Sequence, residues 1–250
     1  MLKFLFLISL FMSFLIANQN YKLLIPLYSH PSQWKSFETQ FKLLKDKNIQ
    51  TYMIINPNNG PGQKVDQSYI DGIKYLKSFD FKIIGYVHTQ YSKRNLFDVK
   101  LDIYNWSDFY GSNRIDGIFF DETDTKKSSF NYYKSLTNYS KVQDFNFNIL
   151  NAGYTTDKIY IDNKIANIII TFENSYEGFL KDFPKNTNKS NDFTKLSILV
   201  HSVKNKKFYD LLLKTQYLNF DFIYFTEDTF PNPWDELSLE FIKTLHKNSN

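Results

Sequence analysis

The stretch DGIFFDE, residues 116–122, ends a short apolar run in two adjacent carboxylates. The IFF segment at 118–120 is typical of a strand that is buried on both faces, as in a parallel sheet. A buried strand does not tolerate charge in its interior, so Asp121 and Glu122 must lie at its end, where a cleft can open. Parallel α/β enzymes deliver acidic side chains in this way. The alternative is that Asp121 caps the next helix and Glu122 is solvated.

Outward from this stretch, short apolar β runs alternate with helical segments along the 250 residues. Eight runs are expected as strands, at 22–28, 51–55, 82–87, 117–121, 147–150, 167–172, 196–200 and 222–225. Helices are expected between them at 33–47, 67–79, 95–110, 128–142 and 208–218, and a last one from Pro233 to about His246. This alternation predicts a single α/β domain over residues 18–250, a (β/α)8 TIM-like barrel.

The residues at the ends of these runs share a polar or amphipathic character. Right-handed crossovers place the C-terminal end of every strand on one face of the barrel, so these residues should surround one mouth. They are Tyr28, Asn56, His88, Asp121, Asn151, Glu173, His201 and Thr226. The alternative is that loops are simply polar.

Composition narrows the classes of function. Hydrophobic residues make up 42% of the chain and aromatic residues 18%, enough for a large core. The net charge of +4 comes from mixed signs without a basic block, so nucleic acid is not an expected partner. The chain has no cysteine, which excludes disulfides and thiolate chemistry.

The first residues resemble an export signal. Lys3 precedes an apolar segment at 4–16, and Ala17 offers a small residue before a polar boundary. The apolar segment is shorter than a typical spanning helix, which favours cleavage of a signal peptide at 1–17. The protein is then secreted, periplasmic or at the cell surface. An uncleaved anchor is the alternative.

The carboxylates at the predicted mouth suit glycoside hydrolysis, in which one carboxyl group donates a proton and another attacks or activates water. Asp121 or Glu122 can face Glu173, and only one of the adjacent pair should point into the cleft because strand side chains alternate. Sugar hydroxyls could be bound by polar residues at the strand ends, and sugar rings by aromatic residues. The expected substrate-binding residues are Tyr28, Asn56, His88, Asn151, His201 and Trp234, with Tyr86, Tyr91, Tyr154 and Tyr176 as further candidate stacking rings.

Two other interpretations use the same residues. The histidines and carboxylates are metal-capable, but no HxH or HExxH spacing is present, so no metal and no cofactor are expected. A noncatalytic carbohydrate-binding protein of the cell surface is the alternative from another functional class.

Several longer segments resemble the motifs of one known family, both in their residues and in their order along the chain. They are IPLY at 25–28, IINPNNGPG at 54–62, GYVHT at 85–89, DVKLDI at 98–103 before Trp106, DGIFFDE at 116–122, TFE at 171–173, YFTED at 224–228 and PNPW at 231–234. Together they are similar to the spherulin-4 family, also called the spherulation-specific family 4.

The resemblance implies a secreted or membrane-anchored (β/α)8 glycoside hydrolase that cuts within α-1,4-linked polymers containing N-acetylgalactosamine. It implies that the acidic pair of the family falls on Asp121 and Glu122 and its later glutamate on Glu173. The sequence interpretation is therefore an exported, monomeric, endo-acting hydrolase of an extracellular amino-sugar polysaccharide. Asp121 is the expected nucleophile or transition-state stabiliser, Glu173 the acid/base, and Glu122 a supporting carboxylate.

Overall fold

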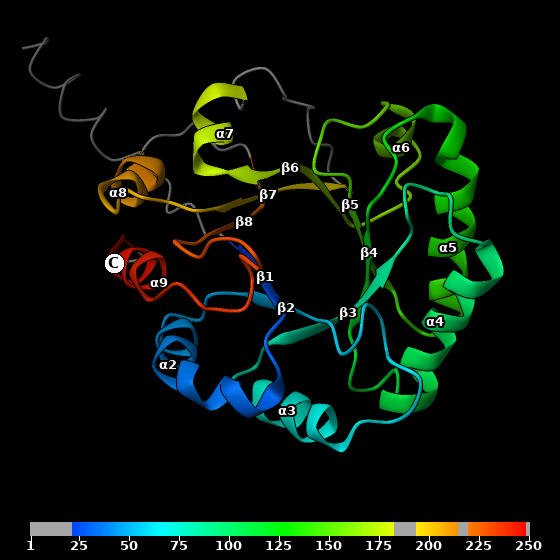
Figure 1. Ribbon diagram of the computed structural model, residues 1–250, viewed down its shortest axis with the longest axis horizontal. Helices are drawn as coiled ribbons and strands as arrows, with labels where there is room; N and C mark the ends of the chain where they lie inside the picture. The colour runs from blue at the N-terminus through cyan, green and yellow to red at the C-terminus, as the bar shows by residue number, and fades with distance from the viewer. Residues whose placement is uncertain (1–21, 183–193, 215–219, 249–250) are drawn as a thin grey trace, which may run out of the picture.

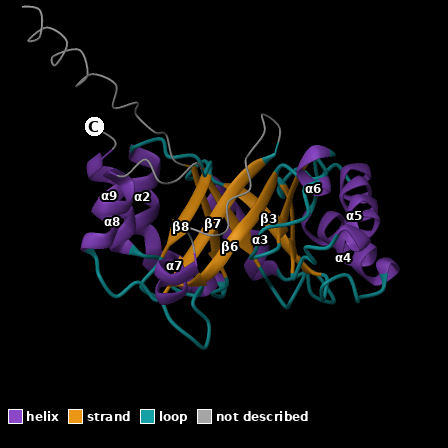
Figure 2. Cartoon of the chain, turned by 90° about the horizontal axis from the view of Figure 1, so that it is seen from above, coloured by secondary structure: helices purple, strands orange, loops and turns teal. Residues whose placement is uncertain are grey.

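The computed structural model of the protein describes residues 22–182, 194–214 and 220–248. Within these residues, eight parallel strands pair in sequence order, and β8 pairs with β1 to close a barrel. Helices surround the strands in Figure 1, and the turned view of Figure 2 shows the slanted strands between two groups of helices. The (β/α)8 barrel predicted from the sequence is confirmed.

Each described strand is followed by a helical segment. The strands are β1 (Lys22–Leu27), β2 (Thr51–Ile55), β3 (Lys82–His88), β4 (Gly117–Asp121), β5 (Phe147–Asn151), β6 (Ile168–Ser175), β7 (Lys195–His201) and β8 (Phe222–Phe225). The α-helices are α2 (Glu38–Asp46), α3 (Gln67–Lys77), α4 (Leu96–Tyr110), α5 (Phe130–Val142), α6 (Ile159–Asp162), α7 (Tyr176–Asp182), α8 (Lys207–Lys214) and α9 (Leu239–Asn248). Two 3-10 segments, η1 (Pro31–Phe37) and η2 (Lys127–Ser129), precede α2 and α5.

Aromatic side chains fill the N-terminal end of the barrel. Tyr52 of β2 stacks on Phe147 of β5 with ring centroids 4.8 Å apart, and it meets Phe222 of β8 edge-on at 5.2 Å. Three strands on different sides of the barrel thus contribute rings to one layer. Such layers make the interior of a parallel barrel a packed core rather than a pore. The polar strand ends therefore lie together at the opposite, C-terminal mouth.

Two glycines allow the close packing that supports the strands under the mouth. A Cβ atom on Gly117 of β4 would lie 1.9 Å from the carbonyl oxygen of Phe147 on β5. A Cβ atom on Gly85 of β3 would lie 2.6 Å from the indole of Trp106 on α4. That indole donates a hydrogen bond to the carbonyl oxygen of Tyr86 at 2.9 Å. The missing side chain on β3 thus lets α4 pack directly against the strand.

The last predicted helix is present, but its predicted start at Pro233 was wrong. The helix α9 begins at Leu239, because Ser238 caps it by accepting the backbone N–H of Phe241 at 3.1 Å. Pro233, followed by acidic residues, resembles the start of a helix, but it belongs to a loop whose Trp234 carbonyl oxygen accepts the N–H of Tyr28 at 2.9 Å. The short helices α6 and α7 were not predicted.

The expected export signal at 1–17 lies outside the described residues, as do the last residues of the helix expected at 208–218. Among the helices that the structure does describe, none combines the length and apolar character needed to cross a membrane.

We expect Gly117→Ala to lower the free energy of unfolding by more than about 3 kcal/mol or to prevent folding, because backbone atoms of β5 cannot move aside for a methyl group. Urea denaturation followed by circular dichroism measures this. Ser128→Ala, at an exposed position, is the control and should change stability by less than about 0.5 kcal/mol. Equal stability of the two variants would contradict the close approach of β4 and β5.

Candidate active site

Three side chains from neighbouring strands meet at the C-terminal mouth of the barrel. Asn151 of β5 donates from Nδ2 to Asp121 Oδ1 on β4 at 2.7 Å and to Glu173 Oε2 on β6 at 2.5 Å. The two carboxyl oxygens can therefore be no further apart than the sum of 2.7 Å and 2.5 Å, about 5.2 Å. Asp121 and Glu173 are both partly exposed, so solvent reaches the pair.

An irregularity in β6 turns Glu173 into the barrel. The register against β7 shifts between Ile170 and Phe172, and Thr171 is the extra residue. Ile170 pairs with Ser197 and Glu173 with Leu199, two residues that share one face of β7, so Ile170 and Glu173 also share a face. Regular alternation would have put them on opposite faces. The bulge thus directs Phe172 outward onto α7, where it contacts Phe179, and Glu173 inward.

Glu173 holds its proton more tightly than an ordinary glutamate. Burial, and then the charge of Asp121, raise the pKa of Glu173 from 4.5 to about 7. Hydrogen bonds from Asn151 and from the indole N–H of Trp234 act in the opposite direction. At neutral pH this carboxyl group can therefore carry a proton while remaining able to lose it.

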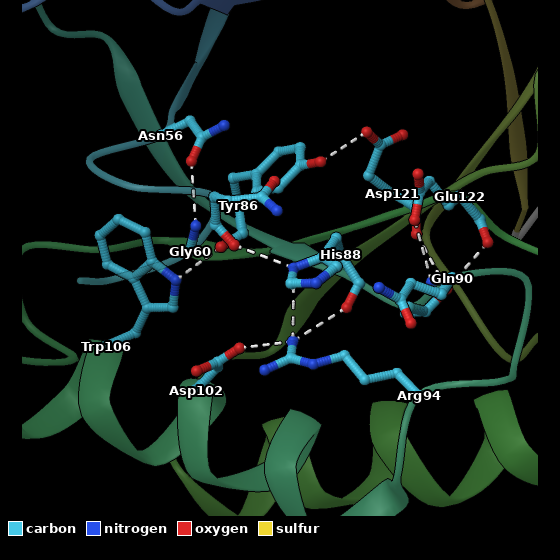
Figure 3. Close-up of polar contacts among 12 residues, drawn as sticks. Asn56, Gly60, Tyr86, His88, Gln90, Arg94, Asp102, Trp106, Asp121 and Glu122 are labelled. Carbon is cyan, nitrogen blue, oxygen red and sulfur yellow. Dashed lines mark hydrogen bonds and ion pairs between the residues drawn. The ribbon is translucent and has the colours of Figure 1, made fainter. Parts of the chain in front are cut away.

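Two tyrosines complete the surroundings of Asp121. Tyr86 of β3 donates its hydroxyl to Asp121 Oδ2 at 2.7 Å, as Figure 3 shows. Tyr28, at the end of β1, packs edge-on against Tyr86 with ring centroids 5.6 Å apart. Burial, and then the charge of Asp121, raise the pKa of both tyrosines well above the ordinary value. Both hydroxyls thus remain protonated donors, and both oxygens of Asp121 are held by donors on neighbouring strands.

Glu122 follows β4 but does not continue its alternation, because its φ of 53° ends the extended backbone. Its Oε2 accepts the backbone N–H of Gln90 at 3.0 Å (Figure 3). Only Asp121 of the adjacent pair therefore contacts Asn151 and Tyr86.

His88 and Asn56 contact the loop after β2. The His88 Nδ1 lies 3.0 Å from the carbonyl oxygen of Asn59, and Asn56 Oδ1 accepts the N–H of Gly60 at 3.0 Å. Arg94 donates to the His88 carbonyl oxygen at 3.1 Å and forms an ion pair with Asp102 at 2.6 Å, below His88 in Figure 3. His88 and Asn56, both predicted to bind sugar, thus stabilise the loop after β2 at the mouth of the barrel.

Trp234 and His201 lie on the other side of Glu173. Trp234 is only 6% exposed, and its indole N–H favours the ionised form of Glu173, so its edge rather than an open face is directed to the site. His201 of β7 packs edge-on against Trp234 with centroids 5.7 Å apart and contacts Ser202 Oγ through Nδ1 at 2.8 Å. Burial lowers the pKa of His201, which favours its neutral form.

Most of the predicted site residues thus come together, although in different ways. The carboxyl groups of Asp121 and Glu173 lie together, with Asn151, Tyr28 and Trp234 around them. The other predicted residues contact the adjoining loops: Glu122, Asn56, His88 and His201. In the part of the chain that the structure describes, no three His, Cys, Asp or Glu side chains gather as a metal site.

The sequence interpretation missed the hydroxyl contact of Tyr86 and the Arg94–Asp102 pair. Tyr86 was predicted only as a stacking ring, yet its place two residues before His88 on one strand puts both side chains on the same face. No comparable signal marks Arg94, whose partner lies on the following helix.

Comparisons with known proteins agree with this fold. The model of the spherulation-specific family 4 matches residues 22–247. Spherulin-4 of Physarum polycephalum is 32% identical over 199 residues, which cover 76% of this chain and 58% of that protein. The chain therefore spans little more than half the length of this relative.

Two solved structures share the barrel. The crystal structure of Sph3 from Aspergillus clavatus, in complex with GalNAc, has a TM-score of 0.77 at 23% identity and covers 92% of this chain and 98% of its own. The tryptophan synthase A-subunit of Pyrococcus furiosus has a TM-score of 0.51 at 11% identity, with coverages of 91% and 96%. At these identities the likeness concerns the fold.

We expect Glu173→Gln to stabilise the protein at pH 8 but not at pH 4. A raised pKa in the folded state means that stability is fully present below the unfolded value near 4.3 and is lost as the pH rises to about 7. The amide mimics the protonated acid and escapes this loss. Because the side chain is partly exposed, we expect a gain of about 2 kcal/mol, or about 4–8 °C in Tm.

Thermal unfolding at pH 4, 6 and 8 measures this difference. Glu240→Gln, on the outer helix α9, is the matched control and should show no such trend. A gain for Glu173→Gln that is independent of pH would contradict the raised pKa.

Proposed function

The chain belongs to the spherulation-specific family 4, and from this premise we propose that it is a glycoside hydrolase that uses Asp121 and Glu173 as its catalytic pair. One observation carries the proposal. The Asp121 Oδ1 and Glu173 Oε2 atoms lie within about 5.2 Å of each other at the mouth of the barrel, and the pKa of Glu173 is raised to about 7. Glycosidases of most families use such a pair.

The separation favours hydrolysis with retention of anomeric configuration. Retaining enzymes hold their carboxyl groups about 5–5.5 Å apart, whereas inverting enzymes need about 6.5–9.5 Å to admit a water molecule. The distance between the two oxygens that accept from Asn151 is short enough for a retaining enzyme.

In the proposed first step, the proton of Glu173 passes to the glycosidic oxygen as the bond from that oxygen to the anomeric carbon breaks. Asp121 attacks that carbon from the other side or stabilises its developing positive charge. In the second step Glu173, now ionised, takes a proton from water, whose oxygen bonds to the anomeric carbon and releases Asp121. Hydrogen bonds from Tyr86 and Asn151 orient the carboxylate of Asp121 in both steps.

We propose an amino-sugar polysaccharide that contains N-acetylgalactosamine as the substrate, cut within the polymer. Support comes from membership of the family and from Sph3, whose crystal structure contains GalNAc. The buried Asn151 Oδ1, which accepts no hydrogen bond from the described residues, is a candidate acceptor for a hydroxyl or amide of the sugar. We further propose that residues 1–17 direct export, that the substrate is extracellular and that the protein acts as a monomer.

A noncatalytic carbohydrate-binding protein of the cell surface is the second candidate. The polar and aromatic residues around the mouth would serve it equally well. It gives no reason, however, for a partly buried glutamate beside a second carboxyl group, because a charge pair of this kind lowers stability without improving sugar binding.

We expect Asp121→Asn and Glu173→Gln each to lower turnover of an N-acetylgalactosamine polymer by at least about a hundredfold, since each removes a group that acts in the reaction. Release of reducing ends by the purified variants measures turnover, and Tm verifies folding. Asp108→Asn, on the exposed face of α4, is the control. Polymer binding by the wild-type protein without release of reducing ends would support the noncatalytic candidate.

We also expect the first product to keep the anomeric configuration of the bond that is cleaved, because the pair is too close to admit water between its members. Proton NMR spectra recorded in the first minutes of hydrolysis, before mutarotation, identify the anomer. Initial formation of the opposite anomer would contradict the short separation of Asp121 and Glu173.

A further inference from the structure

Three consecutive residues in the loop after β3 have a left-handed backbone. Gln90, Tyr91 and Ser92 have φ angles of 49°, 53° and 64°. None is glycine, so each is strained, and a run of three is rarer still. Strain of this kind persists where the surrounding contacts enforce it, and it gathers at sites of function.

Glu122 supplies the contacts that enforce the turn. Its Oε2 accepts the N–H of Gln90 at 3.0 Å, and its carbonyl oxygen accepts the N–H of Tyr91 at 2.7 Å. Thr89 Oγ1 also bonds to this carbonyl oxygen at 2.9 Å. Side chain and backbone of one glutamate thus hold the turn to the end of β4, directly beside Asp121.

The turn presents Tyr91 at the mouth. Tyr91 is 55% exposed, although it lies only three residues after β3 and its N–H is bonded to Glu122, directly after β4. Partial burial and then the charges of Glu122, Asp121 and Glu173 raise the pKa of Tyr91. The turn therefore places Tyr91 at the mouth, beside the end of β4 that carries Asp121.

A second exposed tyrosine stands in the loop after β5. Tyr154 is 58% exposed at the same mouth of the barrel, and it is the smallest of the causes that raise the pKa of Tyr91. It follows Gly153, whose N–H donates to the Ile170 carbonyl oxygen at 3.1 Å and whose carbonyl oxygen accepts the N–H of Glu173 at 3.2 Å. Each tyrosine is thus tied by its own loop to the strand of one catalytic carboxyl group.

We propose that Tyr91 and Tyr154 form an aromatic platform that binds a sugar of the polysaccharide next to the cleaved bond, and that Glu122 positions this platform. Exposed rings with a fixed backbone offer apolar area at little cost in entropy, and their hydroxyls can bond to sugar oxygens. Glu122 is then a positioning residue, outside the catalytic pair. The inference rests on the proposed function, since it assigns a part of the same site.

Binding of an N-acetylgalactosamine oligosaccharide to the Asp121→Asn protein, measured by calorimetry, tests the platform without turnover. We expect Tyr91→Ala in this background to raise Kd about tenfold, and Tyr154→Ala to act in the same direction. Tyr91→Phe, which keeps the ring, should retain most of the affinity. Tyr104→Ala, a tyrosine that is 45% exposed on α4, is the matched control and should leave Kd unchanged.

Hydrogen exchange tests the role of Glu122 without any substrate. In Glu122→Ala we expect faster exchange of the backbone amides of 89–93, whereas Glu122→Gln keeps an oxygen that accepts the Gln90 N–H and should retain the slower rate. Glu122→Ala should weaken binding, and combining it with Tyr91→Ala should add little, because both changes remove one platform.

The outcomes separate the inference from the proposed function. An unchanged Kd in Tyr91→Ala, unchanged exchange in Glu122→Ala, or a fall of kcat in Glu122→Gln as large as that in Asp121→Asn at constant KM would overturn the platform while the wild-type enzyme still cleaves the polymer. Failure of the wild-type protein to bind or cleave the polymer would overturn the proposed function and the platform with it.

Discussion

Two carboxyl groups that share one amide donor set the chemistry of this barrel. Asn151 holds Asp121 and Glu173 so close that two negative charges would repel strongly in a partly buried site. Burial and the charge of Asp121 raise the pKa of Glu173 to about 7, so Glu173 can keep a proton near neutral pH. In the proposed reaction, the proton that a glycosidic oxygen needs is thus present before a substrate arrives.

The fold keeps Asp121 and Glu173 together, despite their repulsion, because elements on both sides of the pair position them. Asp121 and Asn151 end β4 and β5, and Tyr86 lies two residues before the end of β3. The register of these three consecutive strands is regular, so the three side chains share the inner face of the barrel at the mouth. Glu173 joins them only because the bulge at Thr171 reverses the alternation of β6. The loop after β8 completes the surroundings of the pair, since the carbonyl oxygen of Trp234 accepts the Tyr28 N–H and its indole favours the charged form of Glu173.

The barrel could be predicted from the sequence because each strand is a short apolar run followed by polar residues, a pattern that burial on both faces requires. The positions of Asp121 and Asn151 follow from regular alternation along such strands. The sequence could not reveal the direction of Glu173, which depends on a bulge, or that of Glu122, which depends on a left-handed φ. Pro233 misled for a related reason: its helix-start signal is local, whereas the loop is held by distant contacts with β1.

The same electrostatics lets Glu173 exchange roles within the proposed retaining mechanism. While Asp121 is ionised, its charge raises the pKa of Glu173 and keeps the acid protonated for the first step. Once Asp121 is bonded to the sugar its charge is gone, and one cause of the raised pKa disappears. The Asn151 and Trp234 donors, which favour the charged form, then act with less opposition, so Glu173 is an effective base for water. The short distance between Asp121 and Glu173, which share the Asn151 donor, therefore links the stereochemistry of the proposed reaction to the order of its proton transfers.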